Sequence, residues 1–256
     1  MKRPALLLAA ALSLSACAPA ATRPAAAVTD GESLIRAMHD QYAGKWYRTL
    51  TFVQKTTRPG PNDSVRVDTW YEYGAMPGRL RIEFGTRAGP NGAIYANDSS
   101  YAVRNGNVVA RRPGRNSLMI LGFDVYAQAP EQSIRMLREE RFPMGPVRRD
   151  TWQGRPVYVV GGAPGDMKST QWWVDAERLA YVRSFEPFGG DTTKAMEVQF
   201  NDYQRFGGGW VATSVDILVD GRSIQKEEYS NVRVDVPLDP ALFVADRWST
   251  APHPAP

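Results

Sequence analysis

The chain has 256 residues, 31 Lys and Arg against 27 Asp and Glu, and one cysteine. A single cysteine excludes a disulfide within the chain and a cysteine-based metal site, and the formal net charge of +4 is too small to indicate a partner. Aromatic residues at 11% and 19 prolines, without a long helical repeat, favour a β-rich globular domain large enough to bury one sizeable core.

The first residues have the features of a secretory signal peptide. Lys2 and Arg3 precede the apolar run 5–14, which is too short to span a bilayer. The run ends in Leu14-Ser15-Ala16-Cys17, which resembles a bacterial lipobox, where cleavage leaves the cysteine first and acylated. We therefore predict a signal peptide over 1–16 and a lipid anchor, such as palmitate, on Cys17. A plain signal peptide with a chance cysteine is the alternative.

Residues 17–30 are predicted to be the lipidated cysteine and a flexible tether, because small residues and two prolines offer little apolar surface to bury. The residue after the anchor is Ala18. In many Gram-negative bacteria an aspartate at this place keeps lipoproteins in the inner membrane. The resemblance therefore implies an outer-membrane lipoprotein that faces the periplasm, with the inner membrane as the alternative.

The folded domain is predicted to begin with a helix and continue in strands. The run 29–32 offers a capping box, and Leu34, Ile35, Met38 and Tyr42 line one face of the helix, which ends at Gly44. Period-two alternation then predicts about ten strands, joined by short turns into an antiparallel meander. Their segments are 46–55, 65–73, 79–84, 101–104, 108–112, 155–161, 170–175, 179–185, 195–200, 211–219 and 223–234. The turns at 105–107 and 220–221 carry hairpin signals.

A mostly helical insert, Leu118–Phe142, interrupts the strands, and Pro130 opens its second helix. Its first half is apolar on more than one side, so it must be buried on several faces. We predict an α+β, β-rich fold in which a curved antiparallel sheet, a half-open β-barrel, carries a helical lid over an apolar cavity. Ordinary core helices on a sheet are the alternative. The candidate cavity and lid residues are Leu50, Phe52, Tyr71, Leu80, Ile82, Phe84, Leu118, Ile120, Leu121, Phe123, Tyr126, Ile134 and Leu137.

The sequence contains few candidates for catalytic or metal-ligating residues. The two histidines, His39 on the first helix and His253 in a Pro-rich end, form no Ser-His-Asp set and no metal-ligand spacing. Alternation places the strand carboxylates on the solvent side, so we predict no catalytic residue, no metal and no cofactor. A hydrolase that uses two carboxylates is the alternative. These carboxylates are Glu72, Glu83, Glu197, Asp216, Glu227 and Glu228.

Two arginine clusters, 111–115 and 135–141, are predicted to be solvated faces. Contact with lipid headgroup phosphates is the alternative for both. Outside the cytoplasm they would not meet nucleic acid, so no nucleic-acid partner is predicted.

Five short motifs resemble the bacterial lipoprotein-carrier superfamily of LolA, LolB and related lipid-binding lipoproteins. They occur in the family's order, and together with the first helix they span Leu34 to Phe243, nearly all of the mature chain. Met76-Pro77-Gly78-Arg79-Leu80-Arg81 resembles the family's proline-centred entry to its third strand, and Trp172-Trp173-Val174-Asp175 its Trp-Val-Asp hairpin. The closing motifs are Asn201-Asp202-Tyr203, Gly207-Gly208-Gly209-Trp210 and Asp239-Pro240-Ala241-Leu242-Phe243.

The resemblance implies a lipid or acylated lipoprotein as ligand and a membrane-anchored carrier or receptor in the cell envelope. It places the lipid-binding domain at 31–246 and a Pro-rich tail at 247–256. Met76 replaces an arginine that the LolA branch uses to hold its lid, and the loop 85–92 lacks the apolar residue of the LolB branch. The alternative is therefore a non-transporting sensor or assembly factor with other envelope proteins as partners. An enzyme is the third hypothesis.

Overall fold

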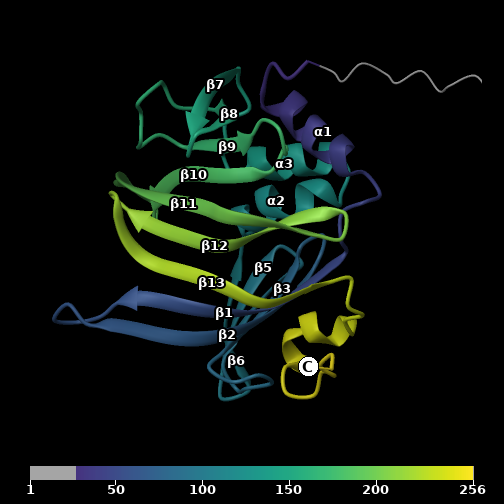
Figure 1. The fold of residues 1–256 in the computed structure, drawn as a ribbon. Coiled ribbons are helices and arrows are strands. Elements are labelled where there is room, and N and C mark those ends of the chain that lie inside the picture. The colour runs from purple at the N-terminus through teal and green to yellow at the C-terminus, as the bar shows by residue number, and fades with distance from the viewer. Residues whose placement is uncertain (1–26, 256) are drawn as a thin grey trace, which may run out of the picture.

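A computed structural model describes residues 27–255, and Figure 1 shows the fold. The predicted signal peptide, Cys17 and Ala18 lie outside the described residues. The fold begins with helix α1 (Gly31–Tyr42). Asp30 caps this helix by accepting the backbone N–H of Ser33, whose side chain reaches back to the cap. A capping box is therefore present, but Ser33 rather than Glu32 closes it.

Thirteen strands in the described part of the chain form one antiparallel sheet in the order β6-β5-β4-β3-β2-β1-β13-β12-β11-β10-β9-β8-β7. The strands before the helical insert are β1 (Thr49–Pro59), β2 (Val65–Ala75), β3 (Arg79–Phe84), β4 (Gly92–Ala96), β5 (Ser99–Arg104) and β6 (Asn107–Pro113). Those after it are β7 (Val147–Trp152), β8 (Arg155–Val160), β9 (Gln171–Asp175), β10 (Tyr181–Phe188), β11 (Asp191–Phe206), β12 (Gly209–Val219) and β13 (Arg222–Val234). The predicted meander is confirmed, with β4 and β7 added to it.

The sheet joins its two halves at one pairing, in which β1 lies beside β13. Both predicted hairpin turns are present, since Asn105, Gly106, Asp220 and Gly221 all have positive φ angles, as a tight hairpin requires. The edge strands β6 and β7 do not pair with each other, so the sheet curves without closing. The predicted half-open barrel is confirmed.

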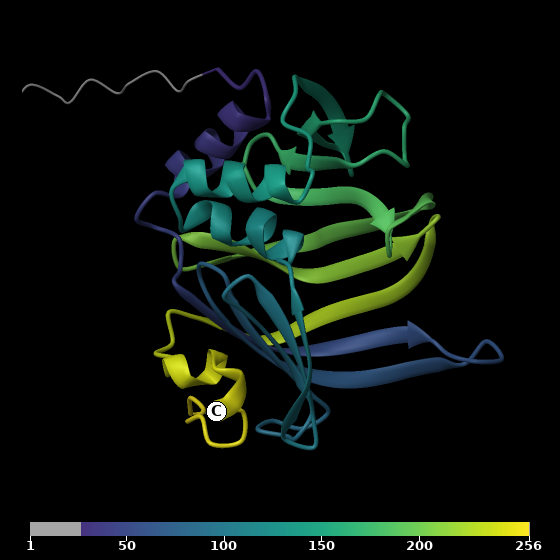
Figure 2. The same ribbon diagram turned by 180° about the vertical axis from the view of Figure 1, so that it is seen from behind.

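The helical insert lies against the inner face of the curved sheet, together with α1 (Figure 2). It consists of α2 (Ser117–Gly122), the short 3-10 turn η1 (Asp124–Tyr126) and α3 (Pro130–Glu139), which begins at the predicted proline. The main hydrophobic core fills the space between these helices and strands β1, β9, β10, β11 and β12. The helices therefore cover a concave apolar face, as the sequence predicted.

The outer face of the sheet is covered too. The C-terminal segment, residues 236–255, contains the 3-10 turns η2 (Pro240–Phe243) and η3 (Ala245–Arg247) and lies beside the lower strands in Figure 1. Leu242, Phe243 and Trp248 pack there with Tyr73 and Ile94 from the outer face of β2 and β4. Residues 247–255, which the sequence set apart as a tail, thus contribute to a second hydrophobic cluster.

A candidate ligand-binding cavity

A cavity of about 120 Å³ lies between α2 and the inner face of the sheet. It is open on one side, and it is smaller than the about 300–1,000 Å³ typical of small-molecule sites. Most of its wall is apolar. The residues that line it are Leu50, Phe52, Trp70, Glu72, Gly74, Met76, Arg79, Leu80, Ile82, Asn116, Leu118, Met119, Phe123, Phe200, Val215, Ile217, Glu227 and Tyr229.

Strand register explains why the predicted strand residues meet in this cavity. Leu50 pairs with Gly74, and Gly74 pairs with Leu80, so these positions share one face of the sheet. Two residues along, Phe52 pairs with Glu72 and Glu72 with Ile82. Period-two alternation then turns all of them toward the helices. The structure brings six of the predicted residues into the wall: Leu50, Phe52, Leu80, Ile82, Leu118 and Phe123.

The remaining predicted residues lie elsewhere. Five of them belong to the packed core beneath the helices and do not line this cavity: Ile120, Leu121, Tyr126, Ile134 and Leu137. Tyr71 faces the opposite side of β2 and packs beside the outer cluster. Phe84 does face inward, but its ring packs against Trp70 with 4.8 Å between the centroids, outside the cavity wall. The helical insert is therefore core on one side and cavity wall on the other.

Other wall residues come from strands that the sequence assigned only to the sheet. Val215 and Ile217 stand on the inward face of β12, and Phe200 on that of β11. Tyr229 from β13 stacks on Phe52 with 4.1 Å between ring centroids. Their alternation was visible in the sequence. Only the pairing of β1 with β13 places them opposite Leu50 and Phe52, and no sequence signal indicated that pairing.

Hydrogen bonds and one close approach hold the helical insert over the cavity. Tyr126 Oη accepts the backbone N–H of Tyr181 at 3.1 Å, which ties η1 to β10. The carboxylate of Asp124 accepts the backbone N–H of Gly78 at 2.9 Å, which ties η1 to the turn between β2 and β3. Ser117 donates to Glu186 at 3.1 Å. Gly122 lies so close to Phe200 that an added Cβ would stand 2.9 Å from the ring, so only glycine permits this approach. Burial raises the pKa of Asp124 to about 7.

The predicted solvent exposure of the strand carboxylates is wrong for four of them. Glu72, Glu83, Glu197 and Glu227 are all at least nine-tenths buried. Glu83 and Glu197 point outward as alternation predicted, but that face is covered as well. Glu72 and Glu227 lie on the inner face instead.

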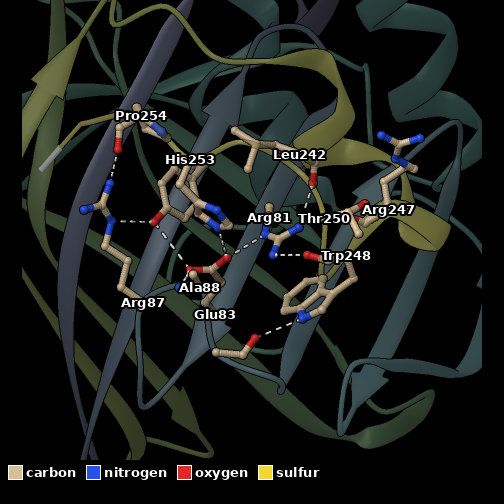
Figure 3. A network of polar contacts seen from close by, with 12 residues as sticks. Arg81, Glu83, Arg87, Ala88, Leu242, Arg247, Trp248, Thr250, His253 and Pro254 are labelled. Atoms are coloured by element: carbon tan, nitrogen blue, oxygen red, sulfur yellow. Dashed lines mark hydrogen bonds and ion pairs between the residues drawn. The ribbon is translucent and has the colours of Figure 1, made fainter.

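Two of these carboxylates are buried with an arginine. Glu83 lies 2.7 Å from Arg81 beneath the C-terminal segment (Figure 3). Glu197 lies 2.6 Å from Arg183, whose guanidinium also lies 4.0 Å from the ring centroid of Trp152. The paired charges offset each other's desolvation cost. These two carboxylates therefore belong to the packing of the outer face.

The other two, Glu72 and Glu227, line the cavity instead. Burial, together with the neighbouring Glu227 carboxyl, raises the pKa of Glu72 well above its ordinary value. Burial also raises the pKa of Glu227, although Tyr229 Oη and Gln225 Nε2 donate to it at 2.7 and 2.5 Å. The cavity is thus an apolar pocket with one acidic wall.

The predicted histidines do not enter the cavity. His39 contacts Asp40 beside it on α1, and His253 lies 2.6 Å from Glu83 on the outer face. Across residues 27–255, no group of three or more His, Cys, Asp and Glu side chains could hold a metal ion. No helix in the same range has the length and apolar character needed to cross a membrane.

No protein-family model and no curated protein matches the sequence. Three solved structures share the fold. A DUF1329 family protein from Desulfovibrio piger has a TM-score of 0.55 at 16% identity, with 83% of this chain and 95% of that one covered. A LolA superfamily protein from Nitrosomonas europaea has a TM-score of 0.53 at 11% identity, and the match covers 85% of this chain and 98% of that one.

The third structure is a domain assigned to outer membrane lipoprotein sorting from Vibrio parahaemolyticus. Its TM-score is 0.53 at 12% identity, and the match covers 86% of this chain and 98% of that domain. At these identities the similarity concerns the fold alone. The chain therefore has the LolA-like fold that its motifs predicted.

Proposed function

We propose that this protein binds a lipid or the acyl chains of a lipoprotein in the cavity beneath its helical insert. The single observation that carries the proposal is an apolar cavity between α2 and the concave face of a LolA-like sheet. Apolar surface in an open cavity gains free energy when a hydrocarbon chain displaces its water. The fold of a lipoprotein-sorting domain supports the same conclusion.

The size of the cavity supports a movable cover. A volume of about 120 Å³ is too small for a long acyl chain. Entry of such a chain requires α2 and η1 to move away from Phe200, which breaks the hydrogen bonds that Ser117, Asp124 and Tyr126 form with the sheet and its turn. The structure then corresponds to the closed form of the domain, and the ligand occupies the space that opens between α2 and β1–β3.

The proposal includes the cell envelope as location. A lipobox at 14–17 supports acylation of Cys17, and Ala18 supports the outer membrane over the inner one. The domain would then work in the periplasm at the end of the tether 17–30. A carrier or receptor of acylated ligands fits this arrangement best.

The direct test is to identify what the protein holds. The chain from residue 17 onward, with Cys17→Ser, would be purified from an envelope fraction and its organic extract analysed by mass spectrometry. Co-purified lipid or acylated peptide at near-stoichiometric amount is the expected result. An extract without lipid, together with no heat of binding when decanol is titrated into the protein, would contradict the proposal. A stoichiometric protein partner without lipid would favour the sensor or assembly factor.

A further inference from the structure

The acidic wall of the cavity has no role in binding a hydrocarbon chain, and it is unusual among the buried carboxylates of this protein. Glu83, Glu197 and Asp175 each lie within 2.7 Å of an arginine nitrogen. Glu72 and Glu227 have no such partner within the described residues, although both are at least nine-tenths buried.

Glu72 is the more isolated of the two. Its strand neighbours are Phe52 on β1 and Ile82 on β3, both apolar. Within residues 27–255 no group donates a hydrogen bond to its carboxyl, and only burial and Glu227 act on its pKa. Most buried polar groups have a hydrogen-bond partner within the protein. The Glu72 carboxyl lines the cavity without one, so it is free to accept a hydrogen bond from a ligand.

The cations nearest to this wall are already engaged. Arg58 lies 3.8 Å from Asp68, and its guanidinium lies 4.9 Å from the centroid of the Trp70 ring. Arg79 also borders the cavity, but its guanidinium lies over the ring of Phe243 at 5.4 Å, on the side of the C-terminal segment. The charge of Arg58 lowers the pKa of Glu227, but neither arginine forms an ion pair with Glu72 or Glu227. A cation in direct contact with these carboxyls therefore has to come from a ligand.

The rest of the wall divides the cavity into two chemical regions. Leu50, Leu80, Leu118 and Phe123 surround its inner part beneath α2, where a chain can pack. On β1, Gln54 and Thr56 are the next buried residues after Phe52 on the same face of the sheet. This face therefore becomes polar toward the β1–β2 hairpin. Glu227 pairs across this boundary with Val215 of β12. A ligand that fits both regions is an amphiphile.

We propose that the cavity selects an amphiphile whose head carries a primary amine or a similar cationic donor, with the amine bound by Glu72 and Glu227 and the chain beneath α2. This inference rests on the proposed function and names its ligand class. An ammonium group supplies a positive charge for both carboxyls and a hydrogen-bond donor for Glu72, while Glu227 already accepts from Tyr229 and Gln225. An alcohol supplies one donor without charge, and a fatty-acid carboxylate adds a like charge to the acidic wall.

Binding should release protons. Burial raises the pKa of both carboxyls, because it disfavours their ionised form. An ammonium head pairs with the ionised form and lowers these pKa values again. Protons that the two carboxyls hold in the free protein then pass to the buffer when the amine binds.

The test compares three ligands with the same chain. Decylamine, decanol and decanoate are titrated by calorimetry at pH 7 into the chain from residue 17 onward with Cys17→Ser. Decylamine should bind about tenfold or more tightly than decanol, and decanoate most weakly. Repeating the decylamine titration in phosphate and in Tris reports proton release, because the two buffers take up protons with different heats.

Two variants locate the effect. Glu72→Gln and Glu227→Gln keep side-chain shape and remove the charge, so both proteins should fold. Each should weaken decylamine binding about tenfold, leave decanol binding within about twofold, and reduce proton release. Glu228→Gln is the matched control, since the Glu228 side chain is 45% exposed and pairs with Lys55 at 2.9 Å. That variant should bind decylamine as the parent protein does.

The outcomes separate the two proposals. Equal binding of the three ligands, or unchanged amine preference in Glu72→Gln and Glu227→Gln, contradicts the amine site while the lipid cavity stands. Preference for decanoate contradicts it as well, and points to a fatty-acid site with protonated glutamic acids. Absence of binding by every ligand contradicts the proposed function and the amine site together.

Discussion

The Nε–H of Arg81 donates to Oε1 of Glu83 across 2.7 Å, and neither side chain is reached by solvent. The two residues are two positions apart on the outer face of β3. The carbonyls of Leu242 and Trp248 accept further guanidinium N–H groups at 3.3 and 3.0 Å, and His253 lies 2.6 Å from Glu83 (Figure 3). A buried ion pair thus fixes the C-terminal segment to the sheet.

We expect Arg81→Met to lower the free energy of unfolding by about 3–5 kcal/mol, because it removes the arginine charge that offsets the desolvation of the Glu83 carboxylate. The double variant Arg81→Met/Glu83→Gln should be more stable than the single one. Urea unfolding followed by tryptophan fluorescence measures both. Lys55→Met is the control, since its exposed pair with Glu228 is worth about 0–1 kcal/mol. Equal losses for Arg81→Met and Lys55→Met would show that the buried pair contributes little.

The same ion pair shows where the sequence was informative and where it was not. Alternation in 79–84 correctly predicted β3 and the inward direction of Leu80 and Ile82. It assigned Glu83 to solvent because charged residues usually face water. The residues that cover it, 236–255, lie more than 150 positions later in the chain. A contact over that separation leaves no mark in a local pattern.

The missed strands have a related cause. β4 is only five residues long and begins with Gly92, and β7 contains Arg148, Arg149 and Asp150 in succession, so neither shows an apolar period of two. Pairing with neighbouring strands forms both of them. The helical insert was predictable because Pro130 and the apolar run before it are strong local signals. Which of its side chains face the cavity depends on packing, and only Leu118 and Phe123 of the predicted set do so.

The second prediction concerns the contact between Asp124 and Gly78, which joins the helical insert to the turn where the LolA branch carries its arginine and this chain has Met76. The Asp124 carboxyl has a pKa of about 7 when folded and 3.8 in the reference state. Its raised pKa favours folding below about pH 4, and this contribution is lost as pH rises toward 7. The pKa difference corresponds to about 4 kcal/mol at most.

Asp124→Asn keeps an oxygen that accepts the Gly78 N–H and removes the ionisation. We therefore expect the variant to be closest to the parent protein near pH 4 and to exceed its melting temperature by a growing amount up to pH 8. Thermal melts of both proteins across this range measure the difference. Asp246→Asn, at an exposed position, is the control and should show a constant offset. A constant offset for Asp124→Asn as well would contradict the prediction.

The third prediction concerns the anchor. Cys17→Ser should move the protein from the membrane fraction to the soluble one, because a multiply acylated cysteine holds a domain stably on a bilayer at about 0.8 kcal/mol per buried methylene. Fractionation followed by immunoblotting measures the change. The parent protein should sediment with outer-membrane markers. A Cys17→Ser protein that stays in the membrane would contradict the anchor, and co-sedimentation with inner-membrane markers would contradict the assigned membrane.

The last prediction compares two neighbouring residues of the helical insert. Leu121 is wholly buried in the main core, whereas Phe123 is partly buried and lines the cavity, with its ring centroid 6.2 Å from that of Phe200. Truncation of a packed core leucine costs about 2–5 kcal/mol. A side chain that faces an open cavity has fewer atoms around it, so its truncation costs less stability but removes surface that a ligand would cover.

We therefore expect Leu121→Ser to lower the melting temperature strongly, by about 2–4 °C for each kcal/mol lost, and to leave decanol binding unchanged at temperatures where the protein is folded. Phe123→Ser should show a smaller loss of stability and about tenfold weaker decanol binding. Thermal melts and calorimetry on the same preparations test both statements. If Phe123→Ser destabilised the protein as much as Leu121→Ser and bound decanol normally, α2 and η1 would be ordinary core, and the ligand would have to bind elsewhere on the sheet.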